Sequence, residues 1–262
     1  MTHATKHIVE TINLEIGFTL KNEKKVIASD LNLTLTSGKL ITLIGENGIG
    51  KSTLLRTLIG IQLELKGKVL LYNKELKNLK NSFLAKKISV VLTDKIPENN
   101  LTVWEIIALG RQPYTNWIGT LTDEDHYHIN NAIQLTEIEH LIHKNHTEIS
   151  DGQLQKVLIA RALAQDTPVI ILDEPTTHLD LLHKVSVFRL LHKLAQNTEK
   201  CILFSTHDID LAIQLSDEMI VMTNSKTYQD LPCNLIEQGV FEQLFNDSTI
   251  TFNKQYGKFI VK

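Results

Sequence analysis

The sequence predicts an α/β fold in which a glycine-rich loop joins a buried strand to a helix. Residues 39–44 form a short apolar strand that ends at a glycine. A glycine-rich turn follows, and a leucine-rich helix begins at Ser52, so this segment has the order of a strand–loop–helix unit. Further along, two apolar strands, Val169–Leu172 and Cys201–Ser205, flank an amphipathic helix at residues 181–194. Such alternation of strands and helices indicates a parallel sheet.

The remaining elements follow from the same patterns. Residues 8–20, 68–72 and 88–92 read as further strands. From residue 93 to 147 helical periodicity dominates and strands disappear, which indicates an inserted helical subdomain. Within it, the acidic run at residues 123–125 is typical of a helix N-terminus.

Composition places the chain among soluble globular proteins. Of its 262 residues 42% are hydrophobic and 22% charged, and 27 basic against 30 acidic residues give a net charge of −3. A dedicated nucleic-acid binder would be basic, so no nucleic-acid partner is expected. Cys201 and Cys233 lack the spacing of a disulfide or metal motif, which indicates a reducing compartment. No apolar run is long enough to span a membrane and no signal peptide is visible, so we expect a cytoplasmic protein.

The most specific motif is a phosphate-binding loop. The residues are Gly45, Glu46, Asn47, Gly48, Ile49, Gly50, Lys51 and Ser52, followed by Thr53, and they match GxxxxGK[ST]. Glycines allow the backbone N–H groups to wrap a phosphate chain, and the following helix directs its positive end at the same anion. Lys51 can reach the β and γ phosphates, and the Ser52 hydroxyl can ligate Mg²⁺. A nucleoside triphosphate with Mg²⁺ is the predicted ligand.

A pair of carboxylates follows the apolar strand Val169–Leu172. Asp173 can hold the Mg²⁺ shell, and Glu174 can orient or deprotonate an attacking water. Alone, such a pair also fits a strand that merely reaches a surface turn. With the glycine loop upstream the pair points to hydrolysis, because parallel sheets bind ligands at the carboxyl ends of their strands.

With these motifs the chain resembles the ATP-binding cassette (ABC) ATPases, and three further segments extend the resemblance. Residues 149–153 (Ile-Ser-Asp-Gly-Gln) resemble the family signature, with Ser150, Gly152 and Gln153 at a helix start. Residues 175–180 resemble the D-loop, which ends at Asp180, and His207 resembles the switch histidine. Ser150 also fits an ordinary helix N-cap.

Two positions, 151 and 93, depart from the family pattern, and position 18 matches it with an alternative reading. Asp151 replaces the second signature glycine, and Thr93 stands where the family has the Q-loop glutamine, followed by Asp94. Thr93 is therefore a candidate metal-site residue, acting through a bridging water or replaced in that role by Asp94. The adenine-stacking aromatic maps to Phe18, which also fits a core phenylalanine.

The resemblance implies one ABC ATPase domain, a P-loop core with an N-terminal antiparallel β subdomain and an inserted α-helical subdomain. Residues 1–92 would carry the nucleotide-binding core, 93–150 the helical subdomain, 151–223 the rest of the core and 224–262 a C-terminal extension. It also implies ATP and Mg²⁺ as ligands, Glu174, His207 and Lys51 as catalytic residues, and a homodimer. In that dimer, Ser150 and Gly152 would cap the γ-phosphate held by a second chain.

Residues 101–114 narrow the resemblance. Their Leu-Gly-Arg-x-Pro-aromatic run is similar to importer ATPases for iron–siderophore, haem and cobalamin. That subfamily implies a separate permease docked on the helical subdomain, an extracytoplasmic substrate-binding protein and a position on the inner face of the membrane. A soluble ABC ATPase that acts as an assembly or regulatory module is the alternative. A phosphotransferase on the same loop is disfavoured by the signature and the D-loop.

Trp104, Tyr114 and Trp117 lie together in or just after this segment. Tryptophan and tyrosine are favoured anchors of protein interfaces. They could equally fill the core of the helical subdomain, and the sequence leaves both readings open.

Overall fold

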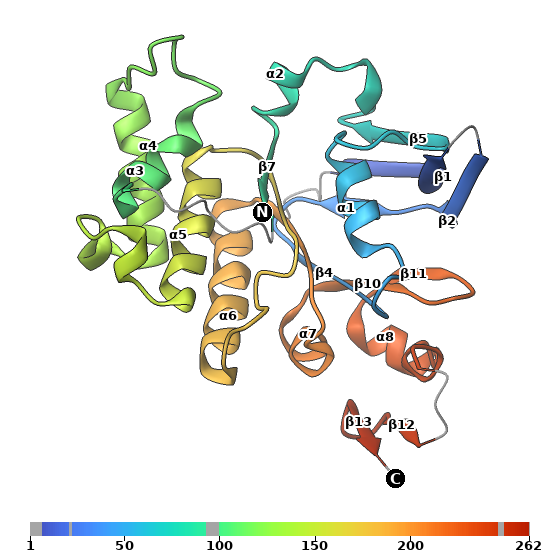
Figure 1. Ribbon diagram of the computed structural model, residues 1–262. Helices are drawn as coiled ribbons and strands as arrows, with labels where there is room; N and C mark the ends of the chain where they lie inside the picture. Colours follow the sequence, from blue (N-terminus) through green and yellow to red (C-terminus); the bar gives the residue numbers. More distant parts are fainter. Residues whose placement is uncertain (1–6, 21–22, 93–99, 246–248, 262) are drawn as a thin grey trace, which may run out of the picture.

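A central sheet organises the chain (Figure 1), which the computed structural model describes over residues 7–20, 23–92, 100–245 and 249–261. The sheet has the strand order β11-β10-β4-β9-β8-β7. Its pairings are parallel from β10 to β7, and β11 adds an antiparallel edge. The strand bounds are β4 Leu40–Gly45, β7 Ile88–Val91, β8 Val169–Leu172, β9 Cys201–Ser205, β10 Glu218–Met222 and β11 Thr227–Asp230. The strands β8 and β9 are buried along their whole length, as expected for strands of a parallel sheet.

The N-terminal part of the chain forms a second, antiparallel sheet. Its strand order is β2-β1-β5-β6, and β3 also pairs with β1. The bounds are β1 His7–Leu20, β2 Glu23–Leu31, β3 Thr34–Thr36, β5 Lys66–Leu71 and β6 Lys74–Glu75. Helix α1 (Lys51–Leu58) contacts both β1 and β4, so it lies between the two sheets.

Helices dominate between β7 and β8, as predicted. They are α3 (Val103–Ala108), α4 (Asp123–Thr136) and α5 (Asp151–Ala164). Helix α4 begins at the predicted acidic run, where Thr122 caps it in a reciprocal pair of hydrogen bonds with Asp125. The predicted fold, with an N-terminal antiparallel subdomain and an inserted helical subdomain, is confirmed.

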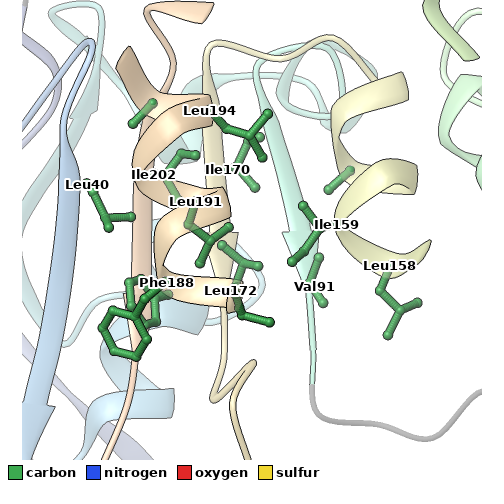
Figure 2. Close-up of a cluster of buried hydrophobic side chains, with 14 of the residues drawn as sticks. Leu40, Val91, Leu158, Ile159, Ile170, Leu172, Phe188, Leu191, Leu194 and Ile202 are labelled. Atoms are coloured by element: carbon green, nitrogen blue, oxygen red, sulfur yellow. The ribbon is translucent and has the colours of Figure 1, made fainter. Parts of the chain in front are cut away.

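The helices α5 and α6 (Leu181–Thr198) are anchored by one buried apolar cluster. Figure 2 shows Phe188, Leu191 and Leu194 of α6 packed beside strand residues such as Leu172. Ile159 of α5 and Val91 of β7 belong to the same cluster. The helices that carry the signature-like loop and the D-loop-like segment therefore share one core.

The C-terminal part of the chain adds α7 (Ile209–Leu215), α8 (Pro232–Glu237) and the hairpin of β12 (Ile250–Asn253) and β13 (Lys258–Val261). Phe252 stacks on Phe241 and meets Phe259 edge-on, with ring centroids 4.9 and 5.0 Å apart. These rings join the hairpin to the main core. The short helix α2 (Asn81–Leu84) precedes β7. Within the described ranges, no helix has the length and apolar character needed to cross a membrane.

Candidate nucleotide-binding site

The phosphate-binding loop runs from the carboxyl end of β4 to the first residue of α1. Gly48 has φ 77° and Gly50 has φ 113°, in the left-handed region that favours glycine. A side chain at Gly50 would also collide with Ile27 of β2, because its Cβ would lie 2.4 Å from Ile27 Cγ2. The glycines therefore set the loop conformation, and the backbone N–H groups at the start of α1 face whatever binds there.

Lys51 is the first residue of α1, and its side chain lies folded over the loop. Its Nζ donates hydrogen bonds to the carbonyl oxygens of Gly45 at 2.9 Å and Glu46 at 3.2 Å. Burial lowers the pKa of Lys51, although the nearby carboxylates of Glu174 and Asp173 act in the opposite direction. The structure thus places the Lys51 ammonium group close enough to the carboxylates of Asp173 and Glu174 for their charges to interact.

Asp173 and Glu174 follow β8 and are tied to the neighbouring strand by a single hydroxyl. Ser205, the last residue of β9, donates to Asp173 Oδ1 at 2.6 Å. The Ser205 hydroxyl oxygen in turn accepts from the backbone N–H of Glu174 at 2.8 Å. Glu174 has φ 49°, a strained conformation for a residue with a side chain. Ser205 is fully buried, so its two hydrogen bonds are shielded from water.

His207, the candidate switch histidine, lies beside the Glu174 carboxylate. The distance from His207 Nε2 to Glu174 Oε1 is 2.7 Å. The other carboxylate oxygen, Oε2, accepts from the Thr177 hydroxyl at 3.2 Å. Both oxygens of the carboxylate are therefore held, which fixes the direction in which Glu174 can accept a proton.

Asp208, next to His207, joins three segments around this site. Its carboxylate accepts from the Thr176 hydroxyl at 2.8 Å and from Lys184 Nζ at 2.6 Å. Thr176 follows Glu174 in the D-loop-like segment, and Lys184 lies in the first turn of α6. This network connects the segment after β8, the segment after β9 and the start of α6.

The signature-like and D-loop-like residues form a second group. Ser150 caps α5 by accepting from Gln153 N, and Gln153 Oε1 accepts from Ser150 N. Asp180 caps α6 through a hydrogen bond from His183 N, and the His183 ring lies against Gly152. Among the described residues, no hydrogen bond or ion pair joins Ser150, Gly152, Gln153, Asp180 or His183 to the phosphate-binding loop, Asp173, Glu174 or His207.

Comparison with known proteins assigns this chain to a family. The family model described as "ABC transporter" matches residues 28–177, more than half of the chain. The chain belongs to the ABC transporter family. The iron(3+)-hydroxamate import ATP-binding protein of Bacillus subtilis is 37% identical over 82% of this chain and 78% of that protein. The resemblance predicted from the motifs is thus confirmed, and the chain is an ABC-type ATPase.

Solved structures agree with this membership. A protein described as a metal-chelate type ABC transporter, in an inward-facing conformation, matches 97% of this chain and 96% of its own. Its TM-score is 0.80 and its sequence identity 26%. A bacterial ABC transporter cassette solved as a dimer matches 86% of this chain and 99% of its own, with TM-score 0.72 and 26% identity.

Phe18 of this ABC cassette lies on β1, paired with Lys25 of β2. Its side chain is exposed, so it is not the core phenylalanine that the sequence left open. Strand β2 touches the phosphate-binding loop through Ile27, two residues from Lys25, so Phe18 lies on the hairpin that borders the loop. Thr93 and Asp94 lie outside the described residues, and Asp151 is exposed in the first turn of α5.

The aromatic residues of the helical subdomain divide between its core and its surface. Trp104 packs against the main core and stacks on His126, with ring centroids 5.8 Å apart. Trp117 is 94% exposed, and Ile118 beside it is exposed as well. Tyr114 lies under the Arg111 guanidinium at 4.0 Å from its ring centroid. Trp104 therefore belongs to the core, whereas Trp117 lies on the surface, where the interface reading stays a prediction.

Ser205, Asp208 and His183 are site residues that sequence reasoning missed. A signal existed for Ser205, because it ends an otherwise apolar strand two residues before His207. Asp208 directly follows that histidine and could have been read as part of the same motif. His183 gave no comparable signal, since its partner Gly152 lies in a distant part of the sequence.

Proposed function

We propose that this ABC cassette is the ATP-hydrolysing subunit of an importer that takes up an iron chelate (siderophore), haem or cobalamin through a separate permease. The similarity to an iron(3+)-hydroxamate import protein and to a metal-chelate type transporter supports this class of cargo. The observation that carries the ATPase assignment is the contact of His207 with Glu174 beside the buried Asp173.

One chain supplies the groups that hold ATP and Mg²⁺. The N–H groups of residues 45–53 would bind the phosphates, Lys51 would neutralise their charge, and Phe18 would stack on adenine. The oxygen donors fit Mg²⁺: Ser52 offers a hydroxyl, and the Ser205 bond to Asp173 Oδ1 leaves Oδ2 for the metal shell. Bound Mg²⁺ would offset the charge of the phosphate oxygens. Thr93 remains a candidate contact to this shell.

Glu174 would act as general base on the attacking water. The water oxygen forms a bond to Pγ while the bond from Pγ to the bridging oxygen breaks, and Glu174 accepts the proton. The products are ADP and phosphate. His207 would hold the Glu174 carboxylate, because its ring lies at hydrogen-bond distance from Oε1. By resemblance to the family's switch histidine, it would also contact the γ-phosphate once ATP is bound.

A second copy of the chain would complete the site. Ser150, Gly152, Gln153 and Asp180 form a group that makes no hydrogen bond or ion pair to the phosphate-binding loop within the described part of the chain. Ser150 and Gly152 at the N-terminus of α5 would instead cap the γ-phosphate bound to the partner. The solved dimer of a similar cassette supports a homodimer.

Replacement of the base tests this arrangement. Glu174→Gln should bind ATP but hydrolyse it about a thousandfold more slowly, so that an ATP-bound dimer accumulates. Size-exclusion chromatography with ATP and Mg²⁺ would show it. Glu199→Gln is a matched control, because Glu199 is exposed and has φ 53°, close to the φ 49° of Glu174. Normal hydrolysis by Glu174→Gln would contradict the assignment of the base.

The permease would dock on the helical subdomain, over the exposed loop around Trp117 and where this subdomain meets the core. A groove of about 600 Å³ is lined by Ile59 and Ile61 after α1, by Leu84 of α2, by Val90 of β7 and by Gln165 after α5. It has both apolar lining and open access, which suits a short amphipathic helix from a membrane protein. Docking there would hold the cassette on the inner face of the membrane, and the substrate-binding protein would act only through the permease.

Co-purification and uptake test the importer assignment. The tagged cassette, expressed with permeases from its own genome, should retain one polytopic partner, and cells should take up radioactive iron–siderophore, haem or cobalamin. Glu174→Gln should retain the partner and lose uptake. A soluble partner in place of a permease would instead support the alternative of an assembly or regulatory module.

A further inference from the structure

The side chain of His183 bridges two segments that are far apart in the sequence. Its Nδ1 lies 2.8 Å from Asp180 Oδ1, the oxygen that also accepts from the His183 backbone N–H at 2.9 Å. These hydrogen bonds lower the pKa of Asp180, so the carboxylate is ionised near neutral pH and can only accept. The ring therefore donates from Nδ1, which fixes its orientation at the start of α6.

The other side of the same ring lies against Gly152 in the first turn of α5. A Cβ at Gly152 would lie 2.7 Å from His183 Cδ2 and 3.2 Å from Cγ. Gly152 lies inside α5 and is not among the positive-φ glycines, so its backbone conformation suits any residue. A side chain at position 152 would therefore have to displace the His183 ring, which occupies the space that glycine leaves.

The contact joins two loops that the proposed function assigns to the partner's nucleotide. Ser150 and Gly152 belong to the signature-like loop, and Asp180 ends the D-loop-like segment. Figure 1 shows α5 and α6 next to one another, and the apolar cluster of Figure 2 holds both on the central sheet. That cluster lies along the helices, whereas His183 joins their N-terminal ends, where both loops begin.

We propose that His183 is a positioning residue that fixes the signature-like loop and the D-loop-like segment to each other, so that both engage the partner's ATP as one unit. This inference rests on the two-chain site of the proposed function. ATP binding to the loop of the same chain does not involve His183, whereas dimer closure and turnover do. The expected defect is consequently in kcat and in dimer affinity and not in the KM for ATP.

His183→Ala tests the role directly. In the full-length chain, kcat should fall about tenfold with the KM for ATP changed less than about twofold, since the lost interaction matters only after ATP has bound. His192→Ala is the matched control, because His192 lies on the same helix, away from α5, and bonds to Gln196. An unchanged kcat in His183→Ala would overturn the proposal.

Two conservative variants separate the two contacts of the ring. His183→Asn can keep a donor to Asp180 but loses the ring over Gly152, whereas His183→Phe keeps a ring but loses the donor. Because the bridge needs both contacts, each variant should recover only part of the wild-type kcat. Full activity in His183→Asn would reduce His183 to a helix cap and overturn the proposal.

A double-mutant cycle tests the bridge apart from the dimer. Gly152→Ala should lower the midpoint of urea unfolding in the wild-type chain but much less in the His183→Ala chain, where the ring is absent. Equal effects in both backgrounds would contradict the contact. This measurement needs no ATP, so it tests the His183–Gly152 contact independently of the proposed function. If Glu174→Gln stays monomeric with ATP, the two-chain site is contradicted, but the cycle still shows whether the contact exists.

Discussion

The Ser205 hydroxyl donates a 2.6 Å hydrogen bond to the Asp173 carboxylate from the strand next to the one that Asp173 follows. Because the Ser205 hydroxyl oxygen also accepts from the backbone N–H of Glu174, one buried side chain holds both the candidate metal-binding residue and the candidate base. The Ser205 hydroxyl thereby also gives the Glu174 backbone N–H a hydrogen-bond partner, although Glu174 has a strained backbone conformation. Ser205 thus holds the candidate catalytic residues although it would touch neither ATP nor Mg²⁺.

Ser205→Ala should weaken catalysis more than binding. Loss of a residue that orients metal ligands typically costs about 10–100-fold in activity or metal affinity, and we expect a fall in kcat and a higher Mg²⁺ requirement. The measurement is ATP turnover as a function of Mg²⁺ concentration. Ser216→Ala, which removes a hydroxyl bonded to Thr42, is the control and should behave as wild type. An unaltered Mg²⁺ dependence in Ser205→Ala would show that Asp173 needs no support.

Phe18→Ala should weaken ATP binding without changing turnover at saturation. Stacking of a base on an aromatic ring contributes about 1–3 kcal/mol, so the KM for ATP should rise about tenfold or more, and Phe18→Trp should restore it. Phe83→Ala is a matched control, because Phe83 on α2 is 40% exposed and Phe18 is 41% exposed. If both alanine variants have the same KM, Phe18 is not the adenine contact.

Trp117→Ser should separate the ATPase from its permease. Trp117 is almost fully exposed, so its removal should change the free energy of unfolding by no more than about 0.5 kcal/mol. Basal ATP hydrolysis of the isolated cassette should also be unchanged. Recovery of the permease on the tagged cassette should fall severalfold, whereas Tyr256→Ser, at another exposed aromatic, should not reduce it. Equal recovery from both variants would move the docking site away from Trp117.

Asp125→Asn should destabilise the helical subdomain at neutral pH. Asp125 accepts from Arg111 Nε at 2.7 Å, and both side chains are buried. Breaking such a pair costs about 3–5 kcal/mol, because the remaining charge is left unpaired. Asp123→Asn, at an exposed position in the same turn, is the control. A urea-unfolding midpoint equal to that of Asp123→Asn would contradict this role.

The same pair predicts an acid limb in the stability of the wild-type chain. Burial raises the pKa of Asp125, but hydrogen bonds from Thr122 and Arg111 more than offset it and lower the pKa to about 2 from the ordinary 3.8. Between these two values the unfolded chain takes up a proton that the folded chain does not. The stabilisation is therefore complete above about pH 4 and is lost as the pH falls towards 2. Urea unfolding across this range should show a steeper loss of stability in the wild-type chain than in Asp125→Asn, which keeps only the contributions of other carboxylates such as Asp166.

Most of the fold and of the nucleotide half-site could be predicted because it is encoded locally. The apolar strand before Gly45 and the glycines after it specify a loop whose conformation depends on residues within a few positions. Likewise the apolar strand before Asp173 fixes where that carboxylate emerges, since a buried strand must end at the edge of the sheet. Candidate site residues that directly follow a strand could therefore be predicted from the sequence.

Contacts made by tertiary packing could not be predicted in the same way. The acidic run at residues 123–125 predicted a helix N-terminus but not that Asp125 is buried, because the Arg111 side chain that pairs with it comes from another helical segment. Similarly, Ser150 reads as a cap from its own neighbours, whereas the reason for glycine at position 152 is a histidine ring on another helix. Such pairings depend on how α4, α5 and α6 pack, which no short sequence window contains.

The buried position of Arg111 changes how the Leu-Gly-Arg run in residues 101–114 should be used. Arg111 Nη1 donates to the carbonyl oxygen of Ala164 at the end of α5, and a side chain at Gly110 would meet the Arg161 carbonyl oxygen at 2.2 Å. The run therefore stabilises the packing inside the helical subdomain. Sequences that share this run therefore share the internal packing of the helical subdomain. Differences in cargo or permease preference should instead be sought in the exposed loop around Trp117.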